Sequence, residues 1–518
     1  MRNQMKYPVG VQSFSEIREN GYVYIDKTNY VYDLTHTPAK YYFLSRPRRF
    51  GKTLLTDTFH CYFEGRRELF EGLAIDSLEK DWTEYPVIHF DLSRGKGLDE
   101  QSLTNTLNSI LESNEKRLGV VGESVDLNIR VNNLIVSAYE KYGKQVVVLV
   151  DEYDAPLLDV AHDDDLLLNL RQIMRNFYSP LKGCHKYLRF VFLTGITKFS
   201  QLSIFSELNN MVNISMDDEY AAICGITDTE LHTDMDDDVA MLASALKVEK
   251  TTMYSMLKEY YDGYHFSEES PDIYNPFSLL QAMDKRKIKP YWFESGTPTF
   301  MLNLLAKHNF DPTELDLIYL DITSFDVALE QSQSVYPLLY QSGYISINSY
   351  DALSELYCLG FPNQEVRLGL MKSLLQNYLG PNADMAKTVV GRMRASLLSD
   401  DIDGALRLLQ TFLGTVPYCR DTHYEGHYQQ MLYIIFTLLG AECRVEERTQ
   451  KGRIDMVLKN TKRIFVIEIK VDESAQAALD QIEEKQYAAR FALDPLPVTR
   501  VGVNFSTEER NITEWIVR

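Results

Sequence analysis

Two separated groups of residues in this chain have the types and spacing that chemistry on phosphate groups requires. The first is Arg48-Arg49-Phe50-Gly51-Lys52-Thr53, a basic loop that ends in Gly-Lys-Thr. The second lies near the C-terminus, where Asp455 is followed by Glu468-Ile469-Lys470. The first group predicts nucleotide binding and hydrolysis. The second predicts metal-dependent cutting of nucleic acid.

The basic loop lies between an apolar strand and a helix, which is the setting of a P-loop. Residues 41–44 predict the strand, and residues 54–63 have helical spacing. In a P-loop, backbone N–H groups surround the phosphates of ATP, the lysine (here Lys52) reaches the β and γ oxygens, and the hydroxyl (here Thr53) binds Mg²⁺. The alternative is an exposed basic turn before a helix.

The loop departs from the GxxxxGK[ST] pattern at its first glycine, which is Arg46 here. Glycine at that position permits a tight turn without strain at Cβ. We expect the arginines to add positive charge near the phosphates. The predicted nucleotide contacts are Arg46, Arg48, Arg49, Gly51, Lys52, Thr53 and Asp151.

A second apolar strand, residues 146–150, ends in Asp151-Glu152. This is the Walker B arrangement, in which Asp151 holds the Mg²⁺ shell and Glu152 polarises the attacking water. The alternative is a strand end with two solvated acids. A later strand ends at Thr194-Gly195, with Lys198 nearby, and Thr194 is either a sensor of the γ-phosphate or part of a plain turn. No arginine finger is identified, and the candidates are Arg171, Arg175 and Arg189.

The C-terminal group is predicted to form a metal site. Glu468 and Lys470 lie two residues apart and therefore share one face of a strand. If the strands pair through the turn at 460–462, Asp455 joins them. The carboxylates of Asp455 and Glu468, with the carbonyl of Ile469, suit Mg²⁺, and Lys470 would orient water.

Two further residues are candidates for this site. Glu425 begins the preceding helix, where it either adds a metal ligand or compensates the helix dipole. Gln481 lies on the helix that follows and is a candidate for positioning substrate. The alternative for the whole group is a solvated hairpin with Glu468 and Lys470 as a surface pair. The neighbouring His423 and His427 lack the spacing of a zinc site.

Several segments together resemble the predicted AAA-ATPase-like family of bacterial proteins. They are Tyr7-Pro8-Val9-Gly10, residues 24–28, residues 45–53, Val150-Asp151-Glu152-Tyr153-Asp154, residues 193–198 and Tyr261-Asp262-Gly263-Tyr264-His265-Phe266. The resemblance covers about residues 5–300. It implies that members of the family usually carry arginine in place of the first P-loop glycine, so Arg46 supports membership in this family. It also implies a C-terminal PD-(D/E)XK nuclease-like domain, which residues from about 418 resemble, and a glutamine on its helix that matches Gln481.

The bulk composition is that of an ordinary folded protein. The 518 residues carry a net charge of -21, which argues against a surface that coats nucleic acid but permits a local basic groove. The six cysteines form no CxxC pair, and their scatter predicts buried free thiols in a reducing compartment. The N-terminus has no apolar signal core, and the longest apolar stretch, 431–441, is too short to span a bilayer. We expect a soluble cytoplasmic protein.

Strands that alternate with helices predict an α/β fold with a parallel P-loop sheet. We expect a P-loop domain over 1–227 and a helical lid over 228–334. Residues 335–415 would form a linker with helices, compatible with a winged-helix module. Residues 416–518 would form an α/β PD-(D/E)XK nuclease-like domain, with strands at 453–458, 463–469 and 499–504 and helices at 425–439 and 473–491.

The leading hypothesis is an ATPase fused to a Mg²⁺-dependent nuclease. ATP would drive or gate a domain rearrangement, and DNA or RNA would be cut. By analogy with other fusions, control of mobile elements or phage defence would suit such an enzyme, and a homo-oligomer is one form it could take. The second hypothesis is a nucleotide-controlled switch or scaffold, whose nuclease-like domain grips nucleic acid or protein without cutting.

Overall fold

The computed structural model of the chain divides into two compact units. Unit 1 comprises residues 1–310 and 315–366, and unit 2 comprises residues 311–314 and 367–518. The structure describes residues 6–93, 99–121, 124, 126–161, 163–198, 210–293, 301–302, 304–305, 308, 310–316, 318–327, 334–379, 383–414, 433–435, 437–439, 443–449, 452–460 and 462–518. Side chains are described in the same ranges except at 313, 316, 376–379, 383–387, 443–449 and 452–455.

Unit 1 is built on a five-stranded sheet in the order β2-β3-β4-β1-β5. Every neighbouring pair is parallel, so the expected α/β fold is confirmed. All six residues of β3 are buried, as expected for a strand covered on both faces. The strands are β1 (Tyr41–Ser45), β2 (Val87–Asp91), β3 (Val146–Asp151), β4 (Leu188–Gly195) and β5 (Val212–Asn213).

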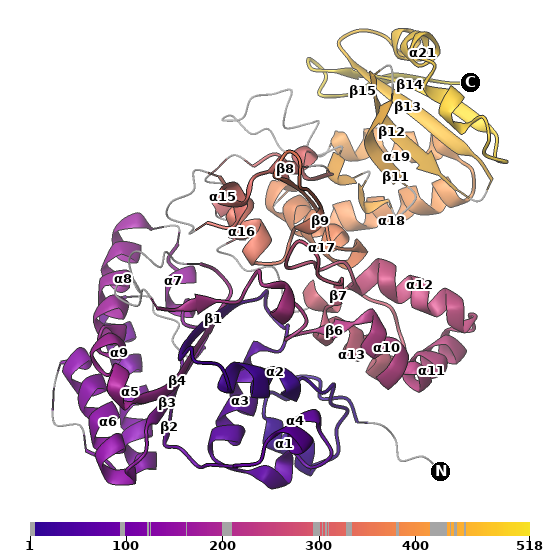
Figure 1. The fold of residues 1–518 in the computed structure, drawn as a ribbon. Helices are drawn as coiled ribbons and strands as arrows, with labels where there is room; N and C mark the ends of the chain where they lie inside the picture. Colours follow the sequence, from indigo (N-terminus) through magenta and orange to yellow (C-terminus); the bar gives the residue numbers. More distant parts are fainter. Residues whose placement is uncertain are drawn as a thin grey trace. The chain divides into compact units, whose positions relative to one another are not determined.

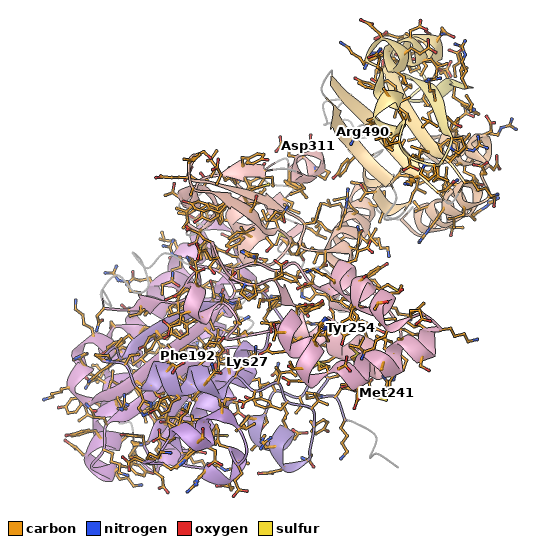
Figure 2. All side chains as sticks on the ribbon, turned by 45° about the vertical axis from the view of Figure 1, so that its right-hand side comes forward. Lys27, Phe192, Met241, Tyr254, Asp311 and Arg490 are labelled. Atoms are coloured by element: carbon orange, nitrogen blue, oxygen red, sulfur yellow. The ribbon has the colours of Figure 1, made fainter. Side chains whose placement is uncertain are left out.

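Helices cover both faces of this sheet (Figure 1). The P-loop helix α3 packs against β3 and β4, while α5, α6 and α8 pack together on the other side. Phe192 lies inside this part of the molecule (Figure 2). The helices are α1 (Phe14–Glu19), α2 (Thr28–Thr35), α3 (Lys52–Phe63), α4 (Ala74–Leu78), α5 (Glu100–Leu118), α6 (Leu127–Tyr142), α7 (Ala155–Leu158), α8 (Asp164–Tyr178) and α9 (Pro180–Gly183).

A helical region follows the sheet in the chain. It includes a short antiparallel pair of strands, β6 (Ile226–Thr227) and β7 (Ile273–Tyr274), which are separated in sequence by three helices. A buried core of leucine, methionine and tyrosine side chains joins its helices, and Tyr7 of the N-terminal segment belongs to this core. Met241 lies at the exposed edge of the region (Figure 2). Its helices are α10 (Asp228–Asp234), α11 (Asp236–Leu246), α12 (Lys250–Tyr261) and α13 (Pro276–Lys285).

The last part of unit 1 is a small three-stranded antiparallel sheet in the order β8-β10-β9. Its strands are β8 (Ile318–Leu320), β9 (Ser346–Asp351) and β10 (Leu356–Gly360), accompanied by α15 (Ile322–Phe325) and α16 (Tyr336–Gln341). A turn at residues 342–345 leads from α16 into β9. We call residues 318–360 the β8–β10 module.

Unit 2 contains a five-stranded mixed sheet in the order β11-β12-β13-β14-β15, in which only β13 and β14 are parallel. Helix α21 packs on β13 and β14. The strands are β11 (Cys443–Thr449), β12 (Gly452–Lys459), β13 (Ile464–Val471), β14 (Val498–Ser506) and β15 (Asn511–Val517). The helices are α18 (Ala383–Leu398), α19 (Ile402–Leu413) and α21 (Ala475–Glu484), while α17 (Gln364–Leu379) begins in unit 1.

The helix expected over 473–491 is shorter in the structure. It ends at Glu484, because Gln486 has a φ of 55° in the left-handed region, and residues Tyr487–Phe491 form a separate 3₁₀ turn. Lys485 and Tyr487 are therefore not part of the helix that carries Gln481.

Candidate functional site

The loop between β1 and α3 has the backbone geometry of a phosphate-binding loop. Gly51 is the N-cap of α3 and has a φ of 94°, a conformation that disfavours residues with a Cβ atom. Its carbonyl accepts from the amide of Leu55 at 2.9 Å, which starts the helix. The helix N-terminus therefore faces the loop, where its unpaired N–H groups and its dipole favour an anion.

Lys52 lies inside this loop. Its amine donates to the carbonyls of Arg46 at 2.9 Å and Pro47 at 3.0 Å. Burial lowers the pKa of Lys52, while the charges of Glu152 and Asp151 act to raise it. The lysine thus turns back onto its own loop, a position from which it can exchange carbonyl partners for phosphate oxygens. Thr53, the next residue, is half-buried.

The structure shows the partners of Arg46 within the protein, and its expected contact with phosphate stays a prediction. Its guanidinium is buried and donates to four carbonyls, those of Ser45 at 2.9 Å, Ser215 at 2.7 Å, Tyr220 at 3.1 Å and Ala221 at 3.3 Å. It also lies 4.1 Å from the centroid of the Phe266 ring. Through its two terminal nitrogens, Arg46 holds the loop to residues 215–221.

The other two arginines differ from each other. Arg49 donates to the carbonyls of Tyr291 at 3.2 Å and Trp292 at 3.3 Å, and it stacks on Phe277 with 3.9 Å to the ring centroid. Arg49 therefore fastens the loop to the helical region, and its expected nucleotide contact stays a prediction. Arg48 is exposed, so the expectation that it adds charge at the surface of the loop stays a prediction.

We expect Arg46→Met to lower the free energy of unfolding by about 3 kcal/mol, because buried carbonyls lose their donors. Chemical denaturation of both proteins measures the loss. The neighbouring Arg48→Met is the control, and its unfolding free energy should stay within about 0.5 kcal/mol of wild type, as for exposed positions generally. Equal destabilisation by the two variants would contradict the structural role of Arg46.

The acidic residues after β3 lie at the same edge of the sheet as the loop. Asp151 is buried and accepts from the hydroxyl of Thr194 at 2.5 Å, so the strand ends of β3 and β4 are joined by side chains. Glu152 has a φ of 52°, an uncommon conformation for a residue other than glycine. Burial raises the pKa of Glu152 and the charge of Lys52 opposes this.

Asp154 is a buried acid that the spacing of the Walker B strand did not single out. Its Oδ2 accepts from the amides of Ile196 at 2.9 Å and Thr197 at 2.6 Å and from the hydroxyl of Thr197 at 2.7 Å. The only sequence signal was its place in the Val-Asp-Glu-Tyr-Asp segment. The residue joins the acidic strand end to the segment after β4.

The described contacts do not assign the role of an arginine finger to Arg171, Arg175 or Arg189. Arg189 donates to the carbonyl of Thr35 at 2.7 Å, which ties β4 to α2. Arg171 and Arg175 lie on α8. The identity of a finger stays open.

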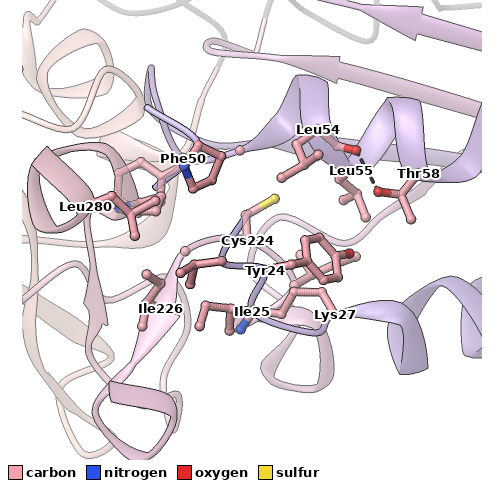
Figure 3. A pocket seen from close by; sticks show the side chains of 16 residues that line it. Tyr24, Ile25, Lys27, Phe50, Leu54, Leu55, Thr58, Cys224, Ile226 and Leu280 are labelled. Carbon is pink, nitrogen blue, oxygen red and sulfur yellow. Dashed lines mark hydrogen bonds between the residues drawn. The ribbon is translucent and has the colours of Figure 1, made fainter. Parts of the chain in front are cut away.

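A cavity of about 90 Å³ adjoins the P-loop. Figure 3 shows Phe50 and Leu54 on one side and Tyr24 and Ile25 on the other, with the sulfur of Cys224 pointing toward Leu54. The lining is mainly apolar and comes from the N-terminal segment, the start of α3, residues 223–226 and α13. Gly51 belongs to the lining, so the cavity opens beside the predicted phosphate site.

One charged side chain, Lys27, also lines this cavity. Its amine donates to Glu230 at 2.5 Å, and Glu230 is the acidic partner in the capping box of α10. The contact thus connects the N-terminal segment to the helical region. No local sequence pattern marks this cavity, because its walls come from four distant segments.

In unit 2 the two predicted strands pair as expected. Met456 of β12 pairs with Ile467 of β13 in an antiparallel register. This last pair of the ladder lies next to Asp455 in β12 and next to Glu468 in β13. The side chain of Asp455 lies outside the described residues, as does the whole of Glu425, His423 and His427.

Glu468 is 3% exposed, and the side-chain amide of Gln481 donates to its Oε1. The structure therefore joins Gln481 to Glu468, as a shared site requires. Lys470 is half-buried, with its amine 4.0 Å from Glu473, and Ile469 lies between it and Glu468 in β13. Among the described side chains, no group of three or more His, Cys, Asp and Glu residues is arranged to hold a metal.

Comparisons with known proteins agree with both halves of this architecture. Residues 8–205 match the family described as predicted AAA-ATPase, and residues 423–515 match the PD-(D/E)XK nuclease superfamily. The chain is also 35% identical over 529 residues to a protein of Azotobacter chroococcum mcd 1 named "Uncharacterized protein in vnfD 5'region", with 99% of each chain covered. The chain is an AAA-ATPase-like protein with a C-terminal PD-(D/E)XK domain. The resemblance predicted from the sequence is confirmed.

Two further observations on this AAA-ATPase-like protein concern membrane spans and cysteines. In the part of the chain that the structure describes, no helix is both long and apolar enough to cross a membrane. Four cysteines whose side chains the structure describes are buried and free, in agreement with the expected thiols: Cys61, Cys184, Cys224 and Cys358.

Proposed function

We propose that unit 1 binds and hydrolyses ATP with Mg²⁺, and that the PD-(D/E)XK domain is a Mg²⁺-dependent nuclease acting on DNA or RNA. The observation that supports the first half best is the meeting of three strand ends. The Lys52 loop follows β1, Asp151 and Glu152 stand at the end of β3, and Thr194 lies at the end of β4. In parallel sheets, ligands bind at this carboxyl edge.

The donors at this edge fit a nucleotide with its metal. Lys52 would leave its two carbonyls for the β and γ phosphate oxygens. The hydroxyl of Thr53 and the carboxylate of Asp151 would hold Mg²⁺, which neutralises developing charge on the phosphates when bound. Glu152 would orient the attacking water, and Thr194, through its bond to Asp151, would keep that carboxylate in place.

The apolar cavity gives the nucleoside a place next to the phosphates. A purine base is flat and weakly polar on its faces, and the lining of Tyr24, Phe50, Leu54 and Ile226 would bury those faces. Gly51 belongs both to the loop and to the cavity lining. A base in the cavity and phosphates on the loop would therefore be close enough to be parts of one ligand. This arrangement supports a nucleoside triphosphate over a simple phosphate ester.

Cys224→Phe should separate recognition of the base from recognition of the phosphates. The Cys224 sulfur points into the cavity, so a phenyl ring there would occupy the space of the base. We expect the affinity for ATP to fall at least tenfold, about 1.4 kcal/mol. The affinity for inorganic triphosphate should stay within about twofold. Calorimetric titration with both ligands measures this, and equal loss for the two would contradict the assignment of the cavity.

The nuclease half rests on the pairing of β12 with β13 and on the bond from Gln481 to Glu468. Opposite positions of an antiparallel pair have Cβ atoms about 5 Å apart, close enough for two carboxylates to share one metal. Asp455, Glu468 and the carbonyl of Ile469 would be the ligands, with Glu425 as a fourth candidate. Lys470 would orient the attacking water, and Gln481 would position Glu468 and the substrate.

We place this enzyme in the bacterial cytoplasm, with control of mobile elements or phage defence as the suggested role. The net charge of -21 requires any nucleic-acid contact to be local, and a homo-oligomer is compatible with the proposal. The experiment that tests it is a cleavage assay on single- and double-stranded DNA and RNA with Mg²⁺ or Mn²⁺, with and without ATP. Binding of nucleic acid or oligomerisation with ATP, but no cutting in any condition, would favour the switch or scaffold instead.

A further inference from the structure

The five residues after the core of β4, residues 194–198, form a segment bonded on several sides to the predicted hydrolysis site. We call it the sensor segment. The carbonyl of Gly195 accepts from the amide of Arg46 at 3.2 Å, and that of Thr194 accepts from the amide of Tyr153 at 3.0 Å. Asp154 accepts from two of its amides, as described above. The segment therefore cannot move without disturbing the loop or the acidic strand end.

The same segment is bonded at its far end to the β8–β10 module. The amide of Lys198 donates to Oε1 of Gln341 at 2.7 Å, and its amine donates to Oδ2 of Asp326. Gln341 is held in turn by a bond from its Nε2 to the carbonyl of Val327 at 2.8 Å. Asp326 directly follows α15 and Gln341 ends α16, so both helices of the module contact Lys198.

The ion pair is partly buried, and this makes its energy sensitive to small movements. The side chains of Lys198 and Asp326 are 15% and 10% exposed. Burial raises the pKa of Asp326, while the charge and hydrogen bond of Lys198 lower it. A buried pair offsets its desolvation only in good geometry, so separating the partners is strongly unfavourable. We therefore expect two states of this ion pair, one in which Lys198 and Asp326 stay in contact and one in which they are fully separated.

The module also touches the P-loop directly. Gly343 packs so closely that a Cβ atom added there would lie 2.7 Å from Cβ of Pro47. A second small cavity, of about 20 Å³, is lined by Arg46 and Pro47 from the loop and by Asp326 and Gln341 from the module. The module thus contacts both the loop that would bind phosphates and the segment that would sense them.

We propose that Lys198 and Asp326 form a latch that couples the hydrolysis site to the β8–β10 module. Lys198 is a positioning residue: anchored on the module, it holds the sensor segment so that Thr194 and Asp154 keep the acidic strand end in its productive arrangement. Changes at the phosphate site reach the module through the same five residues. The proposal rests on the proposed ATPase activity and adds a route for its regulation.

The test compares Lys198→Met and Asp326→Asn with wild type in the full chain. We expect kcat for ATP to fall at least tenfold in both variants, while the Kd for ATP changes less than threefold. Addition of ATP to the wild type should alter hydrogen exchange in β9 and β10, and this response should disappear in both variants. The control is Lys182→Met, an exposed lysine of α9, which should behave as wild type.

A charge-reversed double variant, Lys198→Asp with Asp326→Lys, guards against a purely structural effect. Recovery of kcat to within about threefold of wild type supports the latch. A lower melting temperature, a lower kcat and weaker ATP binding in the single variants, with no recovery in the double variant, would overturn the latch. Single variants with wild-type kcat and wild-type hydrogen exchange would also overturn it. A wild type that neither binds nor hydrolyses ATP would instead overturn the proposed function, and the latch with it.

Discussion

Lys52→Ala should abolish most ATP turnover. The lysine lies inside the loop and contacts only carbonyls there, so its loss removes the cation that would face the β and γ phosphates. Positioned cations of this kind stabilise the charge of the transition state, and loss of one such group typically lowers kcat about a hundred- to a thousandfold. Release of phosphate from ATP, measured at saturating Mg²⁺, gives the effect directly.

The matched control for this variant is Lys182→Ala, which removes an exposed lysine of the same unit. Its turnover should equal that of wild type. A cooperative melting transition for Lys52→Ala would show that the loss is local. ATP turnover that survives the substitution would mean that hydrolysis occurs elsewhere or comes from a contaminant, and the P-loop assignment would then be wrong.

Asp455→Ala should remove cutting of nucleic acid and leave ATP turnover unchanged. The variant would take one of two carboxylates from the proposed metal site, and a metal at such a site supplies several kcal/mol of transition-state stabilisation. We expect a fall of at least about a hundredfold, because each 1.36 kcal/mol is a factor of ten in rate. The measurement is the rate of cleavage of the substrate that wild type cuts best.

Asp480→Ala provides the comparison, since Asp480 is an exposed acid on α21 of the same unit. It should retain full cleavage. Glu468→Gln should lose cleavage as Asp455→Ala does, because the amide keeps the size of the side chain but not its charge. Undiminished cleavage by Asp455→Ala would sink the assignment of the site, whereas the ATPase proposal would be unaffected.

The two variants also report on coupling between the sites. If ATP gates the nuclease, Lys52→Ala should lower ATP-dependent cleavage to the rate seen without nucleotide. Asp455→Ala should hydrolyse ATP at the wild-type rate in the same assay. Cleavage that ignores both ATP and the Lys52 substitution would mean that the two domains act independently.

The sequence by itself determined the order of strand, loop and helix around Lys52 and the family of each domain. The run of valines in β3 predicts a strand buried on both faces, and its end at Asp151 follows from the change to charged residues. The strands β12 and β13 were also predicted from the sequence, because the alternation of apolar and polar residues and the turn between the strands are local properties. Two strands of unit 2, β11 and β15, were not predicted, since β11 is largely polar and the strand character of both depends on the neighbouring strand with which each pairs.

Only the tertiary structure decided what the charged side chains do. Arg46, Arg49 and Lys198 look alike in the sequence as cations near a phosphate site, yet their partners are carbonyls from residues 215–221, carbonyls from residues 291–292 and a carboxylate at 326. The cavity beside Gly51 likewise comes from segments more than 200 residues apart. A local pattern sets strand, loop and helix, whereas the partner of a long side chain is set by which distant segments fold against it.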